Sequence, residues 1–219
     1  MEPCCLTSRD MHYIHLGDGD ILGSLQPKSI FYHNIGSDHD VIDYQVPILD
    51  GSAKEWVEAI EQAGLEDAVD EKGNSCEKMA PYVKVPVYSK RDDSFIVAFP
   101  SEELHITYGI NFPEVPSIGC QWFFSNNFNR SFYSTDIASA RTFCVYEEVE
   151  KMREMGLIKG GSLENAIVCS ASKGWLDAPL RFCNEPCRHK VLDLIGDLSV
   201  FAKSGNQGLP IAHIIAYKV

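Results

Sequence analysis

The segment that most constrains the fold is NEPCRHKVLDLIGDLS, residues 184–199. Asn184 suits the cap of a helix, Glu185 suits the positive helix start, and Pro186 is tolerated in the first turn. A helix that begins here carries apolar residues over more than half of its circumference, which predicts that it is buried between layers of structure. These apolar residues are Val191, Leu194, Ile195, Leu198 and Phe201.

A polar row runs along this apolar helix. His189, Asp193 and Asp197 recur at four-residue steps, so they lie on one face, a turn apart, beside the small Gly196. Two carboxylates that are desolvated together repel each other unless a cation or hydrogen-bond donors offset the cost. Imidazole and carboxylate are both normal zinc ligands. The row therefore predicts a divalent metal site to which His189 and Asp193 contribute two ligands.

The spacing alone is weak evidence, because a His-x-x-x-Asp pair is expected by chance about 0.5 times in a chain of this composition. His39 and Asp43 have the same spacing in a segment that favours an extended or loop structure. Helical context distinguishes the pair at His189. Two alternatives stay open: a hydrogen-bonded or salt-bridged core histidine with exposed aspartates, and a thiolate-rich zinc cluster of Cys183, Cys187 and His189.

The rest of the chain predicts an α+β fold, with helices and a sheet in layers. Residues 1–41 are poorly patterned and are left without assigned structure. An extended stretch then leads to a helix in which Ser52 and Glu55 form a capping box and Gly64 ends the last turn. The other predicted elements are a β-hairpin over 83–89 and 94–100, a strand over 104–113, two helical pieces within 135–156, short strands at 166–170 and 178–182, and a final strand over 208–219. In the second helical piece, Glu147 stands four residues before Lys151 and predicts an ion pair.

Composition excludes several classes of protein. With 45% hydrophobic and 23% charged residues the chain is predicted to be soluble and globular, and 31 acidic against 19 basic residues leave no basic surface for nucleic acid. The eight cysteines show no CxxC spacing, which favours reduced thiols. No run approaches 18 apolar residues, so no membrane span is predicted, and the N-terminus lacks the pattern of a secretory or transit peptide.

Four segments resemble the UDP-3-O-acyl-N-acetylglucosamine deacetylases, the zinc amidases of lipid A biosynthesis, and are most similar to the plant members. They are RHKVLDLIGDL, SARTFCVYEEVEKMREMGLIKGGSLENAIV, VPILDGSAKEWVEAI and the terminal AHIIAYK. The resemblance implies two α+β domains whose helices lie between two sheets. Residues 42–76 would be a remnant of the first domain and 77–219 the second, with an insertion at about 156–182 that forms a passage for the acyl chain.

The resemblance also implies roles for particular residues. His189 and Asp193 correspond to two of three zinc ligands, and Asp197 to the carboxylate that orients a catalytic histidine. Thr142 corresponds to a hydroxyl that stabilises the tetrahedral oxyanion. The substrate contacts would be Phe112, which stacks on uracil, Phe143, and two lysines that meet the sugar nucleotide, Lys190 and Lys218.

The implied reaction is attack of zinc-activated water on the N-acetyl carbonyl of UDP-3-O-acyl-N-acetylglucosamine, which releases acetate. Similarity to plant members implies a mitochondrial location.

The sequence departs from the family pattern at several points. Asn111 stands where an acidic residue is expected. No Glu-His pair occurs, so the third zinc ligand and the general base have no match, and the segments around His33 and His39 do not resemble that motif. The chain stops at Val219, before the Gly-His segment that carries the catalytic histidine.

These departures predict a family member truncated at both ends, with an incomplete first domain and negligible deacetylase activity. The alternative is a non-catalytic fragment, or a sugar-nucleotide-binding paralogue that pairs with a complete copy of the enzyme.

Overall fold

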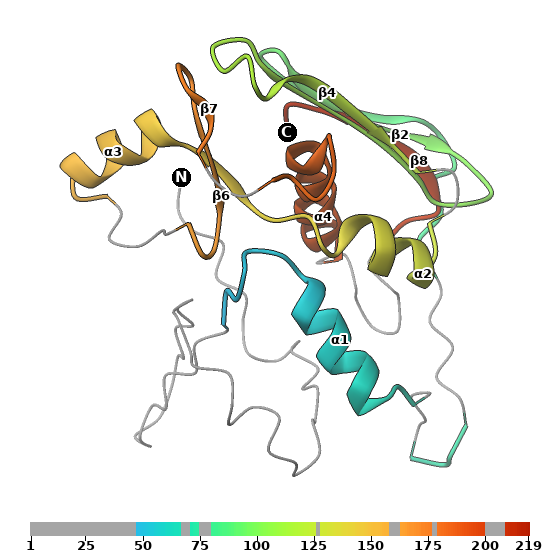
Figure 1. Cartoon of the computed structure of the whole chain (residues 1–219). Coiled ribbons are helices and arrows are strands. Elements are labelled where there is room, and N and C mark those ends of the chain that lie inside the picture. The colour runs from blue at the N-terminus through green and yellow to red at the C-terminus, as the bar shows by residue number, and fades with distance from the viewer. Residues whose placement is uncertain are drawn as a thin grey trace, which may run out of the picture.

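The α+β class is confirmed by a computed structural model, in which helices lie beside two sheets (Figure 1). The structure describes residues 47–66, 71–74, 80–125, 128–157, 163–176, 179–199 and 209–219. Its helices are α1 (Lys54–Ala63), α2 (Arg130–Phe132), the π-helix η2 (Tyr133–Ile137), α3 (Tyr146–Glu154) and α4 (Glu185–Ser199). Its strands are β1 (Val87–Arg91), β2 (Ser94–Pro100), β3 (His105–Phe112), β4 (Gly119–Phe124), β5 (Phe143–Val145), β6 (Ile167–Ser170), β7 (Gly174–Trp175) and β8 (Ala212–Tyr217).

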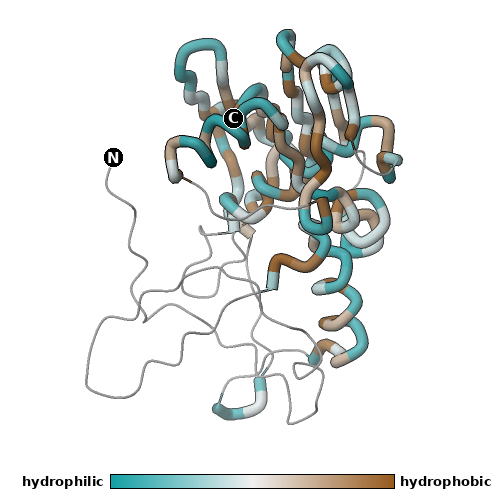
Figure 2. Tube along the Cα trace, turned by 60° about the vertical axis from the view of Figure 1, so that its left-hand side comes forward, coloured by the Kyte–Doolittle hydropathy of each residue, from teal (hydrophilic) through white to brown (hydrophobic). Residues whose placement is uncertain are grey.

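A five-stranded sheet in the order β1-β2-β8-β3-β4 is the main layer. The strand β8 lies between β2 and β3, antiparallel to the first and parallel to the second. The predicted hairpin is confirmed as β1 and β2, joined at Asp92 and Asp93, and the predicted strands at 104–113 and 208–219 are confirmed as β3 and β8. Figure 2 shows hydrophobic positions along these strands and hydrophilic turns between them.

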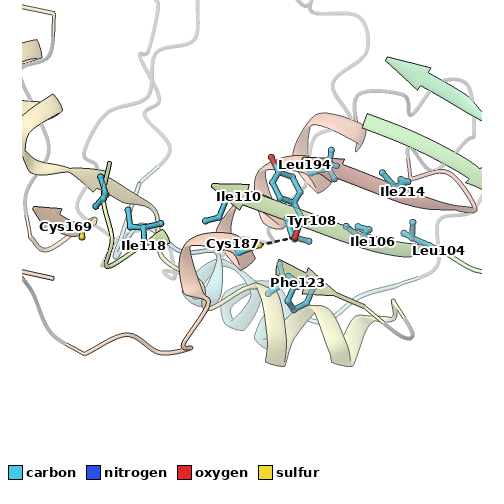
Figure 3. Close-up of a cluster of buried hydrophobic side chains, with 14 of the residues drawn as sticks. Leu104, Ile106, Tyr108, Ile110, Ile118, Phe123, Cys169, Cys187, Leu194 and Ile214 are labelled. Atoms are coloured by element: carbon cyan, nitrogen blue, oxygen red, sulfur yellow. Dashed lines mark hydrogen bonds between the residues drawn. The ribbon is translucent and has the colours of Figure 1, made fainter. Parts of the chain in front are cut away.

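The helix α4 packs against the inner face of this sheet (Figures 1 and 3). The alternation of β3 turns Ile106, Tyr108 and Ile110 toward the helix, where they are buried with Val191 and Leu194. The predicted burial of the helix is confirmed on this side. The last turn of α4 carries the exposed residues Gly196, Asp197 and Ser199, so the described part of the chain does not enclose the C-terminal end of the helix. Phe201 lies outside the described residues.

Two predicted elements in the middle of the chain are wrong. The first helical piece of 135–156 is helical only as far as Ile137, because 143–145 form β5, which pairs in parallel with β6. The predicted strand at 178–182 is absent from its described part, 179–182, and β7 pairs with β6 instead. The second helical piece is confirmed as α3. The strand β4 was not predicted at all.

Local side-chain predictions also need correction. The helix α1 begins after Ala53, which makes no side-chain cap, and the hydroxyl of Ser52 donates to Asp50 Oδ1 at 2.7 Å. The capping box with Glu55 is therefore wrong: the Ser52 amide donates to Asp50 Oδ1 at 2.9 Å, and the Ser52 hydroxyl accepts from the amide of Lys54 at 3.3 Å. Gly64 does end the helix, with a φ of 84°.

The carboxylate of Glu147 accepts hydrogen bonds from Ser170 Oγ at 2.6 Å and from the amide of Ala171 at 3.1 Å. It ties α3 to the turn after β6, so the predicted pairing with Lys151 is replaced by a tertiary contact.

Within the described residues, no helix is both long and apolar enough to cross a bilayer. The poorly patterned residues 1–41, the stretch 42–46, and with them His33, His39 and Asp43, lie outside the described part of the chain.

Candidate functional site

The imidazole of His189 is held in one orientation on α4. Its side chain is 10% exposed, and its Nδ1 lies 2.9 Å from the carbonyl oxygen of Ala140. Because a carbonyl oxygen only accepts, Nδ1 carries a proton, and in the neutral imidazole the lone pair is then on Nε2. Nε2 lies 3.5 Å from Asp193 Oδ1, one helical turn further along.

The spacing of these two atoms suits a shared zinc ion. Two ligands about 2.1 Å from a tetrahedral zinc ion lie about 3.4 Å apart. Histidines that bind metals usually donate their second ring N–H to a carbonyl or carboxylate, as His189 does to Ala140. The described residues contain no group of three converging His, Cys, Asp or Glu side chains. This part of the chain therefore fits two positions of a zinc shell.

The thiolate-cluster alternative is wrong. Cys187 is fully buried and its Sγ donates toward the carbonyl oxygen of Tyr108 at 3.3 Å, on the sheet side of α4 (Figure 3), whereas Cys183 is exposed. The core-histidine alternative explains the bond to Ala140. A salt-bridged core histidine would also place Nε2 of His189 beside Asp193 Oδ1, so this alternative stays open.

The remaining members of the polar row differ in their surroundings. Asp193 is half-exposed, and its Oδ2 accepts from Lys190 Nζ at 3.0 Å, so its Oδ1 is the oxygen that faces His189. Asp197 is exposed one turn further on. Burial, then the negative charge of Asp193, raises the pKa of Tyr108 to about 12, so this buried hydroxyl stays protonated beneath the row.

Four residues that the sequence singled out as substrate contacts come together. Phe112, Lys190 and Lys218 line a pocket of about 200 Å³, which also includes Ile110 and Asn111 of β3. The ring of Phe143 meets that of Phe112 edge to face, with centroids 5.6 Å apart. The strand β3, the helix α4 and the two residues after β8 thus line one apolar pocket with two cationic groups, and Phe143 of β5 packs against one of its walls.

The two pocket lysines are each paired with a carboxylate. Lys190 contacts Asp193, which connects the pocket to the His189 pair, and Lys218 Nζ donates to Asp93 in the β1–β2 turn. The hydrogen bond with Asp93 raises the pKa of Lys218, so this ammonium group is charged at neutral pH.

Thr142 lies two residues after the carbonyl that holds His189. Its amide donates to Gly51 O at 2.7 Å, and its carbonyl accepts from the amide of Ile167 at 2.8 Å. Thr142 is thereby fixed between the 50–52 turn and β6. Thr142 is connected to His189 along the chain, through the carbonyl group of Ala140.

Gly51 allows this close approach, and we predict a large effect of substituting it. Gly51 has φ of +80°, and a Cβ added there would lie 2.2 Å from the carbonyl oxygen of Asn165. Left-handed strain and overpacking together should lower the free energy of unfolding of Gly51→Ala by about 3 kcal/mol, measured by urea denaturation.

Gly156→Ala is the matched control, because Gly156 has φ of +68° with nothing within 4 Å of an added Cβ. Only the left-handed strain should destabilise this variant, and its free energy of unfolding should fall by about 1–2 kcal/mol. Equal losses of unfolding free energy in the two variants would show that the contact with Asn165 does not contribute to the loss in Gly51→Ala.

Glu185 is the important residue that the sequence interpretation missed. It is fully buried, and its carboxylate faces the Arg141 guanidinium, with Nε to Oε1 at 2.9 Å and Nη2 to Oε2 at 3.2 Å. It stands four residues before His189, so it continues the same four-residue row. That spacing was the signal, whereas the sequence interpretation assigned Glu185 only to the helix start.

Asp50 and Arg181 form a second ion pair beside the first, with Arg181 Nη2 to Asp50 Oδ2 at 2.6 Å. Burial by itself would raise the pKa of Asp50, but hydrogen bonds from Ser52 and Arg181 hold that pKa below its ordinary value. A lowered folded-state pKa means that the pair stabilises the fold above the unfolded-state pKa, about 3.9, and that this contribution is lost as the pH falls further.

Comparison with known proteins shows where this chain has relatives. The model of the family LpxC, "UDP-3-O-acyl N-acetylglycosamine deacetylase", matches residues 38–219. The chain is similar to "Probable UDP-3-O-acyl-N-acetylglucosamine deacetylase 1, mitochondrial" of Arabidopsis thaliana, at 56% identity over 201 residues, which are 90% of this chain and 62% of the relative. It is also similar to the "UDP-3-O-acyl-N-acetylglucosamine deacetylase" of Thermosynechococcus vestitus, at 45% identity over 80% of this chain and 55% of that protein. The chain thus spans less than two thirds of these relatives.

Proposed function

The chain belongs to the UDP-3-O-acyl N-acetylglycosamine deacetylase family, and from this we propose that it serves zinc-dependent N-deacetylation of UDP-3-O-acyl-N-acetylglucosamine in lipid A biosynthesis. One observation carries the proposal. Nε2 of His189 and Oδ1 of Asp193 lie 3.5 Å apart, and Lys190 connects them to a pocket that holds an aromatic ring and two ammonium groups.

His189 and Asp193 would hold the zinc ion, two of the three protein ligands of the family. When bound, zinc supplies a Lewis acid that lowers the pKa of water and polarises a carbonyl group. Ala140 keeps the His189 ring in the tautomer that a metal needs, and Lys190 occupies the second oxygen of Asp193.

The other polar residues would act on the substrate. We assign to the Thr142 hydroxyl the donation of a hydrogen bond to the oxyanion that develops during attack on the acetyl carbonyl. Asp197 is exposed one turn beyond Asp193, and its carboxylate could accept a hydrogen bond from the N–H of a catalytic histidine. Both roles stay predictions.

The pocket would bind the uridine diphosphate part of the substrate. The Phe112 ring, supported at its edge by Phe143, offers a surface for the uracil ring, and Lys190 and Lys218 offer charge to the two phosphates. The insertion at about 156–182 would accommodate the acyl chain. The printed names of the Arabidopsis relatives support a mitochondrial location.

We predict that the pocket lysines set nucleotide affinity. Lys190→Ala and Lys218→Ala should each weaken UDP binding about tenfold, because each removes a charged donor worth about 1.4 kcal/mol. Isothermal titration with UDP measures the change. Lys151→Ala is the control, since Lys151 is exposed on α3 and does not line the pocket; a loss for this variant equal to that of Lys218→Ala would indicate non-specific charge.

The function is tested on the purified 219-residue chain. We expect one Zn²⁺ per chain and saturable UDP binding. Because the sequence contains no Glu-His pair, we expect acetate release from UDP-3-O-acyl-N-acetylglucosamine to be negligible for this chain alone. Absence of both zinc and UDP binding would refute the proposed function, and rapid zinc-dependent acetate release would refute the expected impairment.

A second function is favoured by the same pocket. The residues that we propose to contact the nucleotide line one pocket, whereas the described residues bring together only two of the proposed metal ligands. A non-catalytic member that binds sugar nucleotides, and that pairs with a complete copy of the enzyme, would show UDP binding without stoichiometric zinc. Light scattering of the chain mixed with a complete relative tests the pairing.

A further inference from the structure

The segment 138–142 lies between α4 and the 50–52 turn, and described hydrogen bonds hold it at every residue. It carries both the Ala140 carbonyl and Thr142. The bonds are Ala53 N to Ala138 O at 2.8 Å, Arg181 Nη1 to Ser139 O at 2.8 Å, His189 Nδ1 to Ala140 O at 2.9 Å, Arg141 N to Glu185 Oε1 at 3.0 Å and Thr142 N to Gly51 O at 2.7 Å.

Two of these hydrogen bonds are made by a single peptide group, one at its C=O and the other at its N–H. The carbonyl of Ala140 and the amide of Arg141 belong to the same planar unit, in which C=O and N–H point in opposite directions. Glu185 accepts from the N–H, and His189 donates to the C=O. Because Glu185 and His189 stand one turn apart on α4, the helix itself sets the direction of this peptide plane.

Glu185 is in turn fixed from two sides. The Arg141 guanidinium meets both carboxylate oxygens, and the amide of Arg181 donates to Oε2 at 2.6 Å. The Arg181 side chain continues to Ser139 O and Asp50. The buried carboxylate thus joins the segment that precedes α4 to the segment that contacts His189.

We infer that Glu185 is a positioning residue for the metal site. By holding the N–H of Arg141, it keeps the Ala140 carbonyl aimed at Nδ1 of His189, which fixes the tautomer and the direction of Nε2. The inference rests on the proposed function, in which Nε2 is a zinc ligand. Loss of such outer-shell contacts lowers metal affinity about 10–100-fold in metalloproteins.

Glu185→Gln tests the inference, because glutamine keeps the size of the side chain but sets an NH₂ group against donors of Arg141 or Arg181. In the metal-free chain, long-range ¹H–¹⁵N NMR should show His189 as the Nδ1–H tautomer in the parent protein and as a mixture in the variant. Co²⁺ affinity, read from visible absorption, should fall about 10–100-fold.

Val191→Ala is the control for general destabilisation, since Val191 is buried on the same helix but makes none of the hydrogen bonds to the 138–142 segment. It should lower the melting temperature and leave the tautomer and the Co²⁺ affinity unchanged. A folded Glu185→Gln protein with the parent tautomer and parent Co²⁺ affinity would overturn the inference.

Arg141→Lys provides a second test if Glu185→Gln does not fold. It keeps the charge but loses the two-pronged contact with Glu185, and the same tautomer mixture is expected; an unchanged tautomer overturns the inference. The tautomer is measured without metal. A parent chain that binds no Co²⁺ would therefore refute the proposed metal site, while the NMR comparison still decides whether Glu185 positions His189.

Discussion

Glu185→Ala should lower the free energy of unfolding by about 3–5 kcal/mol, the cost of leaving a buried charge without its partner. The Glu185 side chain is fully buried and that of Arg141 is 13% exposed, so water replaces little of the lost interaction. The amides of Arg141 and Arg181 lose an acceptor at the same time. Urea denaturation followed by circular dichroism measures the loss.

Glu150→Ala is the matched control. Glu150 pairs with Arg153 at the same distance of 2.9 Å, but both side chains are more than 40% exposed. An exposed pair contributes about 0.2–1 kcal/mol, so this variant should remain close to the parent. Similar losses for Glu185→Ala and Glu150→Ala would contradict the view that burial determines the value of the contact.

His189→Ala should abolish high-affinity metal binding, with a loss of at least about 100-fold in Co²⁺ affinity. A residue that binds the metal directly, as proposed for His189, should matter more than its hydrogen-bond partners, whose removal costs about 10–100-fold. Competition titration against a chelator of known affinity measures the change.

His213→Ala is the control for this substitution. His213 lies on β8, with its ring against Thr107 Oγ1 at 2.9 Å and near His105, on the sheet face opposite to the α4 contacts. Its Co²⁺ affinity should equal that of the parent. If His189→Ala keeps the parent affinity, or if His213→Ala loses it, the metal is not bound at the polar row.

Periodicity in the sequence predicted the elements in which apolar and polar residues alternate between a buried face and an exposed face. The apolar stripe of α4 and the alternating residues of β3 pack against each other, so their patterns follow from backbone geometry. The β1–β2 hairpin was predicted from its polar turn, although all of β1 is exposed. The family was also predicted from quoted segments, and the match over residues 38–219 confirms it. The polar row at His189 was visible because four-residue spacing on a helix needs no tertiary information.

Predictions failed where a distant segment supplies the partner. Residues 143–145 form a strand because β6 lies beside them. Ser170, 23 residues further along the chain, donates a hydrogen bond to the carboxylate of Glu147. In both cases a partner remote in the sequence, rather than local helix spacing, decides the structure.

The sequence by itself determined that this chain has an interior helix with a histidine and carboxylates on one face, because side-chain direction in a helix depends only on spacing. Only the tertiary structure decided what those groups meet. The Ala140 carbonyl sets which nitrogen of His189 is free, and the Arg141 guanidinium makes a fully buried Glu185 tolerable. Both partners are more than 40 residues away in the sequence, so no local pattern could have identified them.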